Sequence, residues 1–163
     1  MHKLQWIQSK IHTREAMIRL CNVWRASGQK IVFTNGCFDI LHHGHLDLLA
    51  NAADKGNKLV LALNTDASVR RLKGPERPVT HEDDRAFQAA SLLCVDAVCM
   101  FDEDTPLEII QLLKPDVLVK GGDYTVDQIV GAPFVIENGG SVEIIPFVSG
   151  YSTTSIISRI KSL

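Results

Sequence analysis

The chain has 163 residues, of which 45% are hydrophobic and 22% charged, a composition that excludes a disordered chain and suits one α/β domain. Its net charge of -2 provides no basic footprint, so we expect no nucleic-acid partner. No apolar run approaches the roughly 20 residues that span a bilayer, and the four cysteines show no Cys-x-x-Cys pair and no zinc-ligand spacing. We therefore expect a single reduced, cytoplasmic domain over residues 1–163, without membrane association.

Helix and strand signals alternate along the chain. The predicted elements, in order, are a helix over about 13–27, a strand over 30–33, a helix over 43–55, a strand over 58–63, a helix over 67–72, a helix from 80 to about 93, a strand over 96–101, a helix after 105, a strand over 116–119, a short helix near 133, a strand over 141–147 and a helix over 153–160. Because the strands are continuous apolar runs separated by helices, we predict a doubly wound, five-stranded parallel sheet in a Rossmann-like, three-layer α/β/α domain.

Cap residues support three of these helices. Thr13, Thr80 and Thr105 are each placed to begin a helix, and Asp83 follows Thr80 at the spacing of a capping box. The helix over 13–27 has an apolar stripe from Met17 to Trp24, which must be buried either in its own core or in a partner subunit.

Polar loops follow four of the predicted strands. They are Asn35 to His45, Asn64 to Asp66, Lys120 to Tyr124, and Ser149 to Thr154. The carboxyl ends of parallel strands share one edge of a sheet, so these loops are expected to meet there and form a site. Neither Gly-x-Gly-x-x-Gly nor the P-loop pattern is present, which disfavours a redox dinucleotide site and a P-loop enzyme.

The sequence His42-His-Gly-His45 lies at the start of a predicted helix. His42 and His45 are three residues apart and therefore share a face of its first turn. Gly44 between them lets a ligand approach the backbone, and the free N–H groups of a helix start favour phosphate. The two imidazoles suit a phosphorus centre under attack, as in direct phosphoryl or nucleotidyl transfer. A metal cluster is the alternative, but no acidic or cysteine partner completes a ligand set nearby.

The segment from Thr34 to His45 resembles the signature of the His-x-Gly-His nucleotidyltransferase superfamily, and Ser152 to Ile157 is similar to its second motif. Within this superfamily the chain most resembles the adenylyltransferases that form ADP-heptose. The segments that do so are Asn35 to His42, Arg71 to Gly74, Arg77 to Val79, Asp104 to Pro106 and Val119 to Tyr124. This resemblance implies transfer of AMP from ATP to D-glycero-β-D-manno-heptose 1-phosphate, for lipopolysaccharide core assembly.

The resemblance also implies roles for individual residues. The catalytic residues would be His42, His45 and Lys73. The nucleotide- and phosphate-binding residues would be Cys37, Phe38, Gly44, Arg85, Gly121, Gly122, Asp123, Ser152, Thr153 and Thr154. The sugar phosphate would meet Asp39, Asn64 and Asp66. The substrates would be ATP and heptose 1-phosphate, with Mg²⁺ implied by triphosphate chemistry and its ligands unknown.

Each role has a simpler alternative. Lys73 and Arg85 could be solvated helix-face charges, and one of the three hydroxyl residues from Ser152 to Thr154 could only cap a helix. Asp39 and Asp66 could be turn-forming residues.

Two departures from relatives bear on the substrate. Related cytidylyltransferases have an arginine shortly before the Ser-Thr-Thr motif, where this chain reads Pro146 to Tyr151, which weakens a CTP assignment. The chain also lacks the ribokinase-type sugar kinase that is fused to many ADP-heptose enzymes, so a separate protein is expected to supply the sugar phosphate. A cytidylyltransferase acting on glycerol 3-phosphate or a similar substrate, and a non-catalytic nucleotide-binding module, are the competing functions. We also expect a homo-oligomer.

Overall fold

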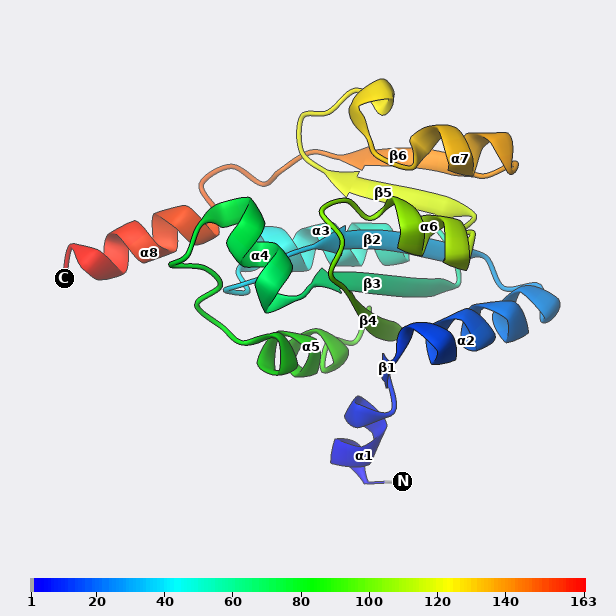
Figure 1. Cartoon of the computed structure of the whole chain (residues 1–163), viewed down its shortest axis with the longest axis horizontal. Coiled ribbons are helices and arrows are strands. Elements are labelled where there is room, and N and C mark those ends of the chain that lie inside the picture. The colour runs from blue at the N-terminus through cyan, green and yellow to red at the C-terminus, as the bar shows by residue number, and fades with distance from the viewer. Residues whose placement is uncertain (1) are drawn as a thin grey trace.

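A parallel sheet forms the centre of the computed structural model, which describes residues 2–163 (Figure 1). In this part of the chain the strands are β1 (Ile11–His12), β2 (Ile31–Gly36), β3 (Lys58–Asn64), β4 (Ala97–Phe101), β5 (Val117–Gly121) and β6 (Ser141–Ile145). Their order across the sheet is β1-β4-β3-β2-β5-β6, and every neighbouring pair is parallel.

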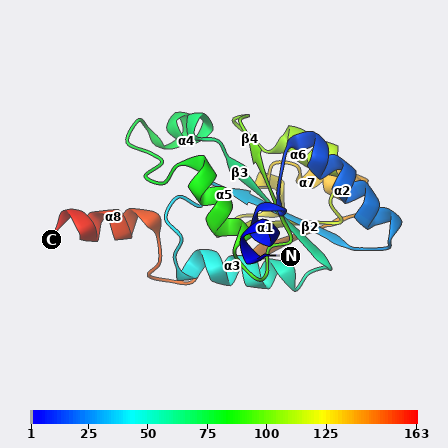
Figure 2. The same cartoon turned by 90° about the horizontal axis from the view of Figure 1, so that it is seen from below.

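Helices cover both faces of the sheet (Figure 2). They are α1 (Lys3–Gln8), α2 (Arg14–Ala26), α3 (His43–Ala53), α4 (Asp66–Lys73), α5 (Glu82–Ala90), α6 (Leu107–Leu113), α7 (Ala132–Glu137) and α8 (Thr153–Lys161), with a 3₁₀ turn at Val126–Gln128. One core cluster joins α2, α6 and α7 to the sheet, and a second joins α3 and α5 to its other face. This arrangement confirms the predicted three-layer α/β/α architecture.

The strand order reverses between β2 and β5. From β2 the chain moves through β3 to β4 on one side, and then returns to place β5 and β6 on the other side. In an open parallel sheet, such a reversal leaves a crevice at the carboxyl ends of the two strands, where ligands bind. The fold therefore places the loop after β2 and the end of β5 at the two sides of one crevice.

The sheet has six strands in the described residues, so the prediction of five was wrong by one. The additional strand, β1, pairs Ile11 with Val98 at the edge of β4 and lies before the helix that was predicted to come first. That helix is α2, and Thr13 caps it by accepting a hydrogen bond from the Ala16 amide. The apolar stripe of α2 packs against the chain's own core, which resolves the two alternatives for its burial.

Two of the predicted caps are wrong. Helix α5 begins after His81 without a side-chain cap, and α6 begins after Pro106 rather than Thr105. The backbone amide of Thr80 instead donates to the carboxylate of Asp39, which is far away in the sequence. A strong buried acceptor has thus taken the place of the local capping box.

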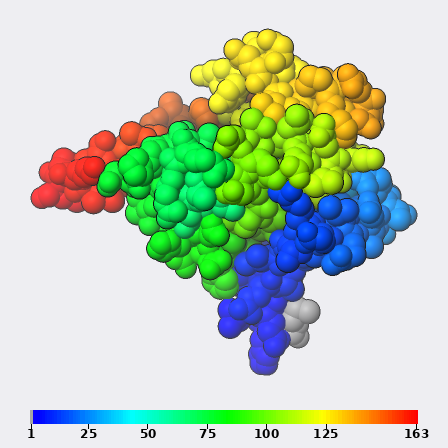
Figure 3. All heavy atoms as spheres, in the orientation of Figure 1, coloured from blue at the N-terminus to red at the C-terminus, as the bar shows by residue number. Residues whose placement is uncertain are grey.

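Helix α8 extends away from the rest of the molecule (Figures 1 and 3). None of its residues is fully buried, although Ser152 caps its start. Across residues 2–163, no helix combines the length and the apolar character needed to cross a membrane.

Candidate active site

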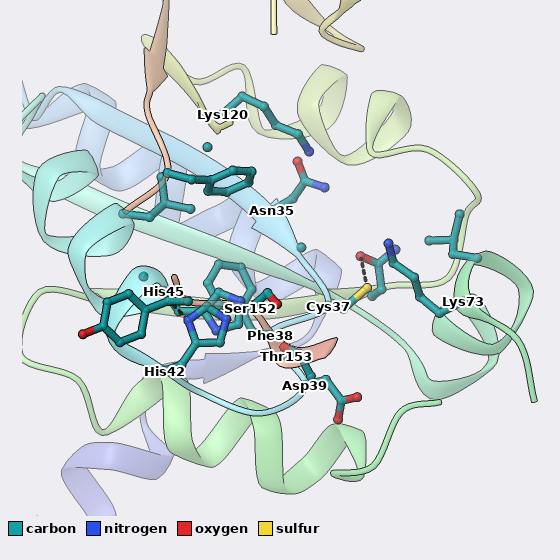
Figure 4. A pocket seen from close by; sticks show the side chains of 18 of the residues that line it. Asn35, Cys37, Phe38, Asp39, His42, His45, Lys73, Lys120, Ser152 and Thr153 are labelled. Carbon is teal, nitrogen blue, oxygen red and sulfur yellow. Dashed lines mark hydrogen bonds between the residues drawn. The ribbon is translucent and has the colours of Figure 1, made fainter. Parts of the chain in front are cut away.

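A cavity of about 660 Å³ opens at the carboxyl edge of the sheet (Figure 4). Its walls come from the loop between β2 and α3, the end of α4, the end of β5 and the segment that leads into α8. The predicted site residues that line it are Cys37, Phe38, Asp39, His42, Gly44, His45, Asn64, Lys73, Gly121, Ser152 and Thr153. Those that do not line it are Asp66, Arg85, Gly122, Asp123 and Thr154.

His42 is the N-cap of α3. Its extended backbone ends the preceding loop, and its Nδ1 accepts a hydrogen bond of 3.3 Å from the amide of His45. An imidazole nitrogen that accepts an N–H cannot itself hold a proton. The neutral ring therefore has its proton on Nε2, and this N–H is free to donate to a ligand.

The rings of His42 and His45 are stacked, with their centroids 3.7 Å apart. Burial, followed by the charge of the neighbouring His42, lowers the pKa of His45 to about 4. Burial also lowers the pKa of His42. The two imidazoles are thus neutral at neutral pH, and an anion is the ligand that would favour their protonation.

Gly44 lies beside the ring of His42 and has no side chain. A Cβ at this position would lie 3.3 Å from the ring of His42 and 3.4 Å from the Cβ of Tyr151. Because that space is free of a side chain, the first amides of α3 stay accessible from the cavity. This geometry agrees with the expected approach of a phosphate to a helix start.

Asp39 ties two loops together. Its carboxylate is 1% exposed and accepts a bond of 2.5 Å from Nε of Arg77 and bonds of 2.8 Å from the amides of Val79 and Thr80. Burial raises the pKa of this carboxyl, but the amide bonds and the Arg77 guanidinium outweigh it, so the pKa lies below its ordinary value. Asp39 therefore anchors the segment after α4, and its contact with a sugar phosphate stays a prediction.

Arg85 is buried rather than solvated, so the interpretation as a helix-face charge is wrong. Its guanidinium donates to the carbonyls of Thr80, Cys37 and Asn64 and to Oδ1 of Asp66. These partners lie on three separate segments that surround the cavity. Arg85 thus holds the site together from behind, and its predicted contact with nucleotide phosphate stays a prediction.

Lys73 is the last residue of α4 and is exposed at the rim of the cavity. Gly74 follows it with a φ of +96°, a conformation that glycine adopts without strain. Lys73 therefore sits where a flexible side chain can reach anionic groups inside the cavity.

The segment before α8 forms the wall beside the start of α3. The hydroxyl of Ser152 caps the helix by accepting the Ser155 amide at 3.0 Å, while Thr153 lines the cavity and Thr154 is exposed outside it. Two helix starts, those of α3 and α8, thus face the same space (Figure 4).

The glycines after β5 are covered by aromatic side chains. A Cβ on Gly121 would lie 3.2 Å from the ring of Phe147, and one on Gly122, at a φ of +126°, would lie 2.9 Å from the rings of Phe147 and Tyr124. The glycines therefore make room for these rings, which lie against the two residues that were expected to bind the nucleotide.

Several lining residues were absent from the predicted site, among them Asn35, Lys120, Tyr124 and Phe147. Asn35 and Lys120 stand at the ends of β2 and β5, so the strand-end rule that selected their neighbours could have selected them too. Phe147 was assigned to the last strand, which in fact ends at Ile145.

Within residues 2–163, no group of three or more His, Cys, Asp or Glu side chains is arranged to hold a metal ion. Asp39, the buried carboxylate of the cavity, is already bound by Arg77. The residues present therefore do not form a protein cage for a divalent ion.

A parallel sheet with a reversal in strand order, two helix starts facing one cavity, and a stacked histidine pair at one of them form a site suited to the phosphate groups of a nucleotide. Comparison with known sequences gives the narrower class. The chain belongs to the Cytidylyltransferase-like family, whose sequence model matches residues 33–159.

Individual relatives agree with this assignment. The bifunctional protein HldE of Trichlorobacter lovleyi is 55% identical over 152 residues, which cover 93% of this chain and 31% of that protein. The chain thus spans about a third of the length of the curated relatives it matches. A lipopolysaccharide core biosynthesis protein from Thermoplasma volcanium has a TM-score of 0.60 and 28% identity, with 77% of this chain and all of that chain covered.

A more distant structure shares the fold alone. The pantoate-beta-alanine ligase of Francisella tularensis has a TM-score of 0.58 at 13% identity and covers 94% of this chain and 78% of its own. Its crystal structure contains beta-gamma ATP and beta-alanine.

Proposed function

We propose that the chain transfers AMP from ATP to D-glycero-β-D-manno-heptose 1-phosphate, giving ADP-heptose and pyrophosphate for lipopolysaccharide core synthesis. The observation that supports nucleotidyl transfer is the stacked pair of His42 and His45 at a helix start, in the same cavity as the helix start at Ser152. The choice of sugar rests on the motifs that resemble ADP-heptose-forming enzymes. Relatives named HldE and a neighbour named for lipopolysaccharide core biosynthesis agree with it.

The chain's residues would act by binding and positioning. The triphosphate would lie between the starts of α3 and α8, where free amides and the Nε2–H of His42 can donate to its oxygens. A phosphate oxygen of the sugar phosphate attacks the α-phosphorus, so a new P–O bond forms as the bond to the β-phosphate breaks and pyrophosphate leaves. His42, His45 and Lys73 would stabilise the charge that builds on the α-phosphate oxygens.

Mg²⁺ would arrive on the triphosphate itself. The described residues offer no carboxylate cage for it. A magnesium ion commonly keeps several waters and binds through substrate phosphates, where it would neutralise their charge.

A CTP-dependent reaction with glycerol 3-phosphate is the alternative. The family's description mentions cytidylyltransferases, but residues 146–151 lack the arginine that such enzymes have before their Ser-Thr-Thr motif. A non-catalytic module is less consistent with the site, since both imidazoles and the hydroxyls of Ser152 and Thr153 line the cavity.

We also propose that the enzyme acts in the cytoplasm on ATP and heptose 1-phosphate, and that it self-associates. The cysteines Cys21, Cys37, Cys94 and Cys99 are free thiols, in keeping with a reducing compartment. Sedimentation of the purified chain tests the self-association.

The proposed reaction is tested by pyrophosphate release from each combination of ATP or CTP with heptose 1-phosphate or glycerol 3-phosphate. We expect a signal with ATP and heptose 1-phosphate, and His45→Ala should lower its rate by about 10²–10³. His43→Ala is the matched control, because His43 is exposed and does not line the cavity. A signal only with CTP and glycerol 3-phosphate would overturn the proposal, and an unchanged rate in His45→Ala would remove His45 from the mechanism.

A further inference from the structure

Lys120 is a cation at the reversal point of the sheet. It lies near the end of β5 and lines the cavity. Strands β2 and β5 pair Val32 with Val117 and Phe33 with Leu118, and the same register continued by two residues brings Asn35 opposite Lys120. Both residues line the cavity, so two polar side chains from neighbouring strands enter the crevice where ligands bind in this kind of sheet.

The ammonium group of Lys120 has no protein partner among residues 2–163. It makes no ion pair or hydrogen bond with them, and its nearest charge-stabilising contact is the ring of Tyr124, whose centroid is 5.9 Å from Nζ. Burial lowers the pKa of Lys120; the nearby Cys37 opposes this shift, and the charge of Lys73 adds to it. A half-buried cation without a counter-charge is costly, so this position favours an anionic ligand.

The acidic side chains of the cavity are committed elsewhere. Asp39 is bound by Arg77, and Asp104 is bound by Arg71 at 2.8 Å. Lys120 is therefore not the partner of either carboxylate. The negative charge that would pair with the ammonium group of Lys120 must therefore come from a ligand.

Lys120 also lies apart from the two helix starts. Figure 4 shows His42, Ser152 and Thr153 together on one side of the cavity, with Lys120 and Asn35 on another side. The helix starts already supply amides, imidazoles and hydroxyls for a triphosphate. The reaction has a second anionic group, the phosphate of the sugar phosphate, which attacks the α-phosphorus. The β2–β5 side of the cavity is where Lys120 could bind it.

We propose that Lys120, with Asn35 beside it, binds the phosphate of the acceptor sugar phosphate and so makes the enzyme require a phosphorylated acceptor. This inference rests on the proposed function. In the reaction, the ammonium holds the attacking phosphate against the α-phosphorus and offsets the repulsion between the two anions.

The test compares Lys120→Met with Lys120→Arg and with Lys55→Met, whose lysine is exposed and pairs with Glu143. Loss of a charge-assisted hydrogen bond to phosphate should raise the KM for heptose 1-phosphate by about 10- to 100-fold in Lys120→Met. The KM for ATP should stay within about twofold of wild type. Lys120→Arg should recover much of the loss, and Lys55→Met should behave like wild type. A rise in the KM for ATP, or an unchanged KM for heptose 1-phosphate, would overturn the inference.

A second measurement separates this inference from the proposed reaction. Inorganic phosphate is titrated by calorimetry into the enzyme saturated with α,β-methylene-ATP, so no sugar and no turnover are needed. We expect phosphate binding in wild type and at least tenfold weaker binding in Lys120→Met. Equal binding by both proteins overturns the role of Lys120. Weaker binding in Lys120→Met, combined with no turnover of heptose 1-phosphate by wild type, refutes the choice of sugar while supporting the phosphate site.

Discussion

Replacing Asp39 with asparagine should destabilise the protein strongly. Asparagine keeps the size of the side chain and one acceptor oxygen, but it removes the charge that faces Arg77 and turns an amide donor toward the guanidinium. Asp39 is 1% exposed in its side chain and Arg77 only 17%, so little water can replace the lost partner. Removing one member of a buried pair costs about 3–5 kcal/mol, and we expect about 3 because Arg77 keeps some exposure. That is a large part of the roughly 5–15 kcal/mol that holds a domain folded.

Equilibrium unfolding in urea measures the loss. The matched control is Glu143→Gln, which breaks the pair with Lys55 where both side chains are more than 40% exposed, and which should cost no more than about 1 kcal/mol. The pKa of Asp39 is lowered in the folded state, so its contribution is present above the ordinary carboxyl pKa and is lost as pH falls through the lowered value. Asp39→Asn should therefore also flatten the acid limb of the stability curve. A loss below about 1 kcal/mol, or an unchanged acid limb, would refute the reasoning.

Two further predictions concern the histidine pair and the glycines after β5. The pKa of His45 is about 4 in the folded state, below its ordinary 6.5, so the unfolded chain binds this proton more readily. The contribution of His45 to the free energy of unfolding should be complete above pH 6.5 and should fall as the pH drops toward 4. His45→Gln should therefore weaken the dependence of the melting temperature on pH in this range. An equal dependence in both proteins would contradict the lowered pKa of His45. Gly122→Ala should cost at least about 1 kcal/mol more than Gly139→Ala in urea unfolding, because only the Cβ at 122 meets neighbouring rings at 2.9 Å. Equal costs would show that the rings move aside freely.

Much of the sheet could be predicted because its strands are continuous apolar runs between clear helix signals. β1 could not, because the two residues Ile11 and His12 have too short a pattern to show any period. The capping box at Thr80 was misread for a different reason. Local spacing supports it, but the carboxylate of Asp39 binds the amide of Thr80 through a contact 41 residues away in the chain.

The part of the site that lies in the loops after the strands could be predicted from the sequence. His42, His45, Ser152 and Thr153 follow strands of a parallel sheet, and that rule brings them to one cavity. Arg85 could not be placed, because two of its partners are the backbone carbonyls of Cys37 and Asn64 on remote segments, and such partners have no signature in the sequence. Lys120 lies in a segment that was predicted to reach the site, but a single lysine has no pattern in the sequence that distinguishes a ligand-binding residue from a solvated one.

Helix α8 supplies one wall of the cavity through Ser152 and Thr153, yet none of its residues is fully buried. A helix of nine residues has little stability of its own in water, so its order depends on what its first turn binds. By linkage, a ligand that binds only the ordered helix stabilises it by RT ln(1 + [L]/Kd), and the free energy needed to order the helix is subtracted from the binding free energy. Substrate affinity can therefore be tuned by substitutions along the solvent side of α8 that never touch the substrate.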